Sequence, residues 1–166
     1  MNLTRLSTLE PRWNGLIETV AAMITLAPEY VVLQTYTPEG QELGAYVQTL
    51  QEEDGALTIE ASSDTYFPGL INPDSLNTLH ELGWEDPSEF GLPNYNIFLQ
   101  SDEVKPGEVA AFLVLTLRDV YGITPSHQFE CAPQELFIQI VHGEFGKAPG
   151  LRFSPIDLSE IPRKTD

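Results

Sequence analysis

The three histidines and the single cysteine are the side chains best suited to metal binding or catalysis. His80, His127 and His142 are far apart in sequence, and no closely spaced His pair, HExxH or CxxC pattern occurs. Cys131 has no second cysteine for a disulfide, and a lone cysteine is more often a small packing residue than a nucleophile. We therefore predict no metal site, and a site built from scattered carboxylates is the alternative.

Other catalytic patterns are also missing. Ser126 and His127 are adjacent in sequence, which does not bring their side chains together, and neither GxSxG nor a glycine-rich phosphate loop is present. The triplet Glu52-Glu53-Asp54 is interpreted as a solvated hairpin turn. We predict no catalytic residue, no cofactor and no enzyme activity, with an enzyme whose site is unrecognised as an alternative.

The charge balance narrows the choice of partner. The chain has 25 acidic and 8 basic residues, for a net charge of −17. Phosphate binding depends on Lys and Arg, so neither nucleic acid nor an anionic membrane is expected to bind. The charge either serves solubility alone or keeps soluble a carrier of sticky or basic protein segments.

Length and composition indicate one domain over residues 1–166. The apolar fraction of 42% is ordinary for a globular protein. The N-terminus lacks a signal-peptide pattern, and no apolar run approaches the ~18 to 20 residues of a membrane span. A cytoplasmic location is therefore predicted.

The elements that would position any site follow from hydrophobic spacing. Residues 13–27 have helical spacing, and the segments 30–36, 45–51 and 56–62 read as an antiparallel meander joined by short Gly-containing turns. Asn72 and Gly83 are predicted to cap a second helix at its start and its end.

The second half continues with a strand over 95–100 and a helix from Pro106 to a cap at Gly122. That helix has no charge between Glu108 and Arg118, so we expect it to be covered on more than one side. A second subunit could supply the extra cover, which favours a homodimer. Residues 135–141 read as a possible fifth strand.

The ordered set AYVQTLQ, LTIEASSDTYF, LHELGWEDP, PNYNIFLQ and LVLTLRDVYGI resembles the TY-Chap domains. These are relatives of YbjN-type proteins and of class I type III secretion chaperones. The resemblance covers about residues 11–125 and leaves 126–166 as an extension.

The resemblance implies an α+β fold with helices packed on one antiparallel sheet, in the order α-βββ-α-β-α with a possible extra C-terminal strand. It also implies a non-enzymatic, chaperone-like role in which an extended protein or peptide client binds to apolar grooves and sheet edges, commonly in a homodimer. Only one strand is read between the second and third helices, where the chaperone fold has two. An acidic inhibitor or immunity-type protein for a basic partner is the alternative function.

Four residues are candidates for lining a peptide-binding groove. Trp84 and Tyr95 flank an aromatic-rich loop, and Tyr46 and Gln48 lie on a strand. Each also has a purely structural interpretation. For Trp84, this is packing back onto the helix that ends at Gly83.

Overall fold

The structure is a computed structural model that describes residues 1–26, 29–88 and 91–136. Its centre is a five-stranded antiparallel sheet in the order β4-β3-β2-β1-β5. The strands are β1 (Tyr30–Tyr36), β2 (Glu42–Gln51), β3 (Leu57–Ala61), β4 (Tyr95–Leu99) and β5 (Gln128–Ala132). The helices are α1 (Asn14–Leu26), α2 (Pro73–Leu82) and α3 (Pro106–Tyr121), with 3₁₀ turns η1 (Leu6–Thr8), η2 (Pro11–Trp13) and η3 (Ser101–Glu103). This confirms the predicted α+β fold class.

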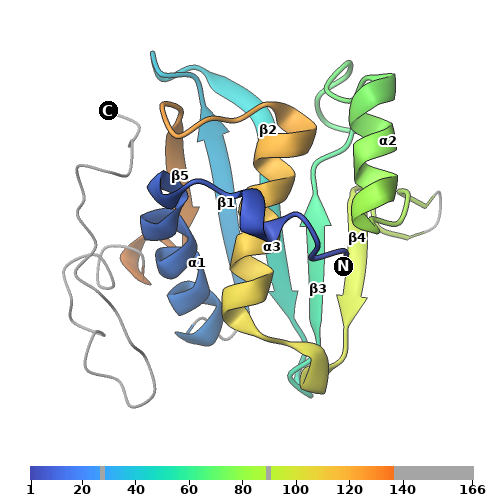
Figure 1. The fold of residues 1–166 in the computed structure, drawn as a ribbon. Coiled ribbons are helices and arrows are strands. Elements are labelled where there is room, and N and C mark those ends of the chain that lie inside the picture. The colour runs from blue at the N-terminus through green and yellow to red at the C-terminus, as the bar shows by residue number, and fades with distance from the viewer. Residues whose placement is uncertain (27–28, 89–90, 137–166) are drawn as a thin grey trace.

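Helices α1, α2 and α3 lie on one face of the sheet, with α3 between α1 and α2 (Figure 1). Strand residues alternate between the two faces. In every strand the odd-numbered residues point to the helices, and among them Leu33, Val47, Ile59 and Ile97 belong to the buried core. The even-numbered residues point to the other face, which no helix of the described residues covers. We call it the helix-free face.

Helix α2 begins and ends where its capping residues predict. The Asn72 side chain accepts a 2.9 Å hydrogen bond from the Ser75 amide, which satisfies one of the free N–H groups of the first turn. At the other end Gly83 adopts the left-handed region at φ 94°, which a residue with a side chain rarely enters. These local signals place the loop that carries Trp84.

The N-terminal residues supply the second cover of α3. Leu3, Leu6 and Leu9 pack against the core, and Arg118 of α3 donates hydrogen bonds to the carbonyl and hydroxyl oxygens of Thr8, at 2.7 and 2.6 Å. The sheet, α1, α2 and this segment together bury α3 within one chain. The apolar character of α3 therefore does not require a second subunit.

The fifth strand lies earlier than predicted. It is β5, which pairs antiparallel with β1 from Val32↔Ala132 to Tyr36↔Gln128. The prediction of a strand over 135–141 is wrong at its start, because residues 134–136 are helical, and the rest of it lies outside the described residues. Pro133 follows β5 directly and has no amide hydrogen with which to continue the ladder.

Candidate functional site on the helix-free face

A row of side chains crosses the helix-free face at one end of the sheet. The pairings Tyr30↔Leu50, Leu50↔Thr58 and Thr58↔Phe98 place these four residues side by side across β1, β2, β3 and β4. Tyr30 is 41% exposed and Phe98 is 57% exposed, and among the described residues the only other large apolar side chain this open is Tyr66. We call these four residues the cross-strand row. Two of the three most exposed large apolar groups therefore lie in line on one surface, which is typical of a contact site.

A polar network lies next to this row on the same face. Gln48 donates a 2.7 Å hydrogen bond to Oε2 of Glu60, and the Asn94 side-chain amide lies 3.4 Å from Oε1. The Asn94 amide also donates to the Tyr46 hydroxyl at 2.9 Å. Glu60 is only 2% exposed, so these amide donors replace the water that the carboxylate gives up.

Farther along the same face, Tyr36 donates a 3.0 Å hydrogen bond to the carboxylate of Glu130. Burial, this hydrogen bond and the nearby charges of Glu130 and Glu42 raise the pKa of Tyr36 to about 12. The phenol is therefore neutral at physiological pH. The helix-free face thus changes from apolar at the Phe98 end to hydrogen-bonded and acidic at the Tyr36 end.

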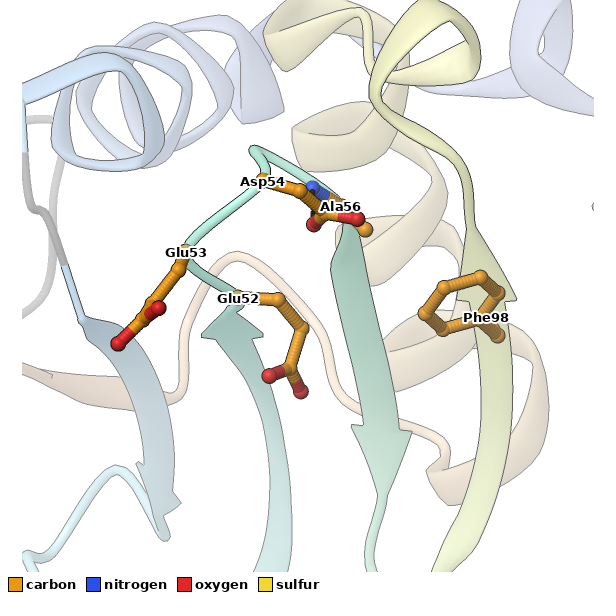
Figure 2. A pocket seen from close by; sticks show the side chains of 5 residues that line it. All are labelled: Glu52, Glu53, Asp54, Ala56 and Phe98. Atoms are coloured by element: carbon orange, nitrogen blue, oxygen red, sulfur yellow. Dashed lines mark hydrogen bonds between the residues drawn. The ribbon is translucent and has the colours of Figure 1, made fainter.

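The turn between β2 and β3 forms an acidic rim at the apolar end. A hollow of about 430 Å³ is lined by Glu52, Glu53, Asp54, Ala56 and Phe98. Figure 2 shows Glu52 and the Phe98 ring on opposite sides of β3, with the hairpin turn above them. The Asp54 carboxylate accepts a 2.9 Å hydrogen bond from the Ala56 amide, which holds the turn in shape. This agrees with the predicted hairpin turn.

The outer edge of β4 is largely closed to another strand. Glu85 exchanges two backbone hydrogen bonds with Asn96, at 3.0 and 3.1 Å, and forms an isolated antiparallel bridge with it. Farther along, the Gln100 amide donates to the Glu103 carboxylate at 2.8 Å. In an antiparallel edge strand, the backbone N–H and C=O groups point outward at every second residue. Phe98 is therefore the one residue between Asn96 and Gln100 whose backbone groups point to the open edge. The helix-free face is therefore a larger open surface than the outer edge of β4.

The four predicted site residues divide between the two sides of the sheet. Tyr46 and Gln48 lie on the helix-free face, in the polar network. Trp84 and Tyr95 lie on the helix side and are 3% and 8% exposed. The Trp84 ring stacks on Phe112 with 5.5 Å between centroids, and its Nε1 donates to the Thr116 hydroxyl at 3.2 Å. Burial, followed by the charges of Asp86 and Asp64, raises the pKa of Tyr95.

The residues considered for catalysis have local structural partners. The His127 Nδ1 accepts a 2.9 Å hydrogen bond from the Thr124 amide, and the Ser126 hydroxyl pairs with that of Thr124 at 2.7 Å. On the surface, His80 Nε2 lies 2.7 Å from Oδ1 of Asp86. Cys131 is buried in the core. Within residues 1–26, 29–88 and 91–136, no three His, Cys, Asp or Glu side chains are grouped so as to hold a metal ion.

A family model matches residues 7–132, and it is described as TY-Chap3, T3SS (YopN, CesT) and YbjN peptide-binding chaperone 3. The chain belongs to this family. The match confirms the resemblance to secretion-chaperone and YbjN-like domains. No curated protein and no solved structure matched the chain.

The family assignment supports a chaperone-like binding role for this TY-Chap3 protein, with a protein or peptide as partner. The matched range contains strands β1 to β5 and helices α1 to α3. It therefore includes the whole cross-strand row and the acidic rim. In the described part of this TY-Chap3 chain, no helix is both long enough and apolar enough to cross a membrane.

The cross-strand row was not predicted from the sequence, although the sequence contains a pattern that indicates it. The runs Val31-Val32-Leu33 and Ile97-Phe98-Leu99 place apolar side chains on both faces of β1 and β4. A strand with one solvated face shows clean alternation instead. Consecutive apolar residues in an edge strand such as β4 are thus the pattern that points to a second contact surface.

Proposed function

We propose that this chain is a non-enzymatic binding protein that holds an extended segment of a client protein on its helix-free face. The observation that carries the proposal is the cross-strand row, in which Tyr30 and Phe98 remain exposed on a sheet face that the described helices leave open. Family membership supports a peptide or protein as the partner. Burying two aromatic rings would supply much of the binding free energy.

Within this proposal, the four residues predicted from sequence have two kinds of role. Tyr46 and Gln48 border the binding surface, and with Glu60 they keep its middle rigid. Trp84 and Tyr95 support the face from behind, through the core under α2 and α3. The alternative of an acidic inhibitor for a folded basic protein receives no support from the family assignment.

The homodimer and the cytoplasmic location stay predictions. The helix that suggested a second subunit is covered by its own chain, so the dimer now rests on the resemblance alone. Sedimentation equilibrium of the full chain tests it, because a dimer doubles the mass of 18.5 kDa.

The test of the proposed function is selection from a library of random twelve-residue peptides displayed on phage, with the full chain as bait. We expect enrichment of peptides with apolar residues. We also expect Phe98→Ala to weaken their binding about tenfold or more, as for an aromatic hot spot. Tyr66→Ala is the matched control, because Tyr66 is 61% exposed and lies in the loop after β3, outside the row.

Two outcomes would overturn the proposal. One is a selection that enriches no peptide. The other is equal loss of binding in Phe98→Ala and Tyr66→Ala, which would indicate a general apolar stickiness instead of a site. Capture of a folded basic protein without any peptide binding would favour the inhibitor.

A further inference from the structure

The chemistry of the sheet indicates which segments it accepts. The five strands, and the turns that join β1 to β2 and β2 to β3, contain no Lys or Arg. The basic residues of the described chain are Arg5, Arg12, Lys105 and Arg118, all outside the sheet. Arg5 forms ion pairs with Glu81 and Asp119, and Arg118 pairs with Asp119. Among the described residues, the strands and hairpin turns of the helix-free face therefore present acidic side chains and no Lys or Arg.

The spacing of the cross-strand row sets the spacing of the apolar side chains that would bind it. From Tyr30 to Phe98 the row crosses three gaps between strands, which is roughly 14 Å at the usual strand separation. An extended chain advances about 3.3 Å per residue, so four residues cover about 13 Å. Side chains at i and i+4 of an extended chain also point the same way. A segment lying across the strands can therefore place one apolar group at each end of the row.

The acidic rim lies next to one end of that row. One further pair, Gln51↔Leu57, separates Leu50 and Thr58 from the turn. Phe98 belongs to the row and also lines the hollow. A Lys or Arg near the apolar residue over Phe98 can lay its aliphatic stem along the ring and direct its charge to the hairpin carboxylates. The charges are exposed, so the attraction is sensitive to salt.

We propose that the helix-free face selects extended segments with apolar side chains four residues apart and a Lys or Arg beside the one that contacts Phe98. This inference rests on the proposed function and specifies the client. The proposed occupant of the helix-free face is a segment of another protein, and this segment contains both basic and apolar side chains. Such a segment combines the apolar contact with charge complementarity, which speeds association and rejects acidic competitors.

The experiment uses fluorescein-labelled twelve-residue peptides in a Ser/Gly background, with Leu at positions 4 and 8 and either Arg or Gln at both positions 7 and 9. Affinities for the full chain are measured by fluorescence anisotropy. At about 0.05 M salt we expect the Arg peptide to bind about tenfold more tightly than the Gln peptide, and at about 0.5 M salt we expect the difference to shrink.

Two pairs of matched variants test whether the β2–β3 turn causes the preference for the Arg peptide. Glu52→Gln with Glu53→Gln should reduce the preference for Arg severalfold. Glu39→Gln with Glu42→Gln removes the same charge from the hairpin at the opposite end of the sheet, and should leave the preference unchanged. An Arg preference that persists in the Glu52/Glu53 variant overturns the inference, because the peptide Arg side chains would then contact other acidic residues.

The peptide affinities distinguish a wrong charge preference from a wrong proposed function. If Arg and Gln peptides bind the natural chain equally, and Phe98→Ala weakens both, the function stands and the charge preference is wrong. If neither peptide binds and the library also enriches nothing, both proposals are wrong. A peptide with Leu at positions 4 and 7, and with its two Arg residues moved to positions 6 and 8, should bind more weakly than the Arg peptide of the 4 and 8 design. Equal binding contradicts the spacing.

Discussion

The two faces of this sheet are made by alternating residues of the same five strands, yet they have different neighbours. On the helix side, Ile59 and Ile97 are packed against the core under α2 and α3. On the other side, their sequence neighbours Glu60 and Phe98 form a buried polar network and an exposed aromatic surface. Among the described residues, the apolar core therefore lies on the helix side, and the helix-free face is the one that we propose for binding.

The covered face should produce the largest loss of stability. Trp84→Ala removes the stack on Phe112 and leaves a cavity, so we expect the free energy of unfolding to fall by about 3–5 kcal/mol in urea denaturation. Trp84→Phe retains a ring and should cost less. Unchanged stability of Trp84→Ala together with lost peptide binding would show that Trp84 belongs to the binding site and not to the stabilising core.

Two adjacent residues of β4 separate the contributions of the two faces, because their side chains point to opposite sides of the sheet. Ile97→Ala should cost about 2–4 kcal/mol of unfolding free energy, since Ile97 is 8% exposed. Phe98→Ala should cost less than about 1 kcal/mol, since its ring is mostly in solvent. Equal costs in the same urea titrations would show that Phe98 is a core residue and would remove it from the proposed site.

Within the helix-free face, Glu60 should matter more than Glu130. Glu60→Gln forces an amide nitrogen toward either Gln48 or Asn94, both of which are donors here, so we expect a loss of about 1–2 kcal/mol. Glu130→Gln changes an exposed carboxylate on the same face and should stay within about 0.5 kcal/mol. Chemical denaturation at pH 7 measures both, and a neutral Glu60→Gln would mean that the network does not hold the face in place.

The smallest expected effect is at the start of α2, away from the sheet. Asn72→Ala removes the acceptor for the Ser75 amide and should cost about 1 kcal/mol. Asn77→Ala changes an exposed residue inside the same helix and should be neutral or slightly stabilising. Thermal unfolding of the two variants is the measurement, and a lower midpoint for Asn77→Ala than for Asn72→Ala would contradict the role of the cap.

Local signals made much of the fold predictable. The capping residues Asn72 and Gly83 act within a few residues of the helix they bound, so sequence alone places α2 correctly. The strand over 95–100 was predicted for the same reason, since it is apolar and bounded by polar loop residues. The observed β4 is Tyr95–Leu99.

Non-local contacts explain what sequence did not predict. Strand β5 mixes Gln128 and Glu130 with Phe129, so its pattern is weak, and it is defined by pairing with β1, about a hundred residues earlier. Part of the cover on α3 comes from the N-terminal segment, which packs through three leucines, Leu3, Leu6 and Leu9, and is too short to form a helix of several turns. Glu60 is buried through donors from two other segments, which no local spacing indicates.

Intermolecular NOEs test whether a client segment binds to the helix-free face. The complex of the full chain with a library-selected peptide, methyl-labelled on the protein, gives the measurement. We expect contacts from the peptide to the methyl groups of Val32 and Leu50, which lie on this face. Contacts confined to side chains of α1, α2 and α3, such as Ile17 and Leu76, would contradict it.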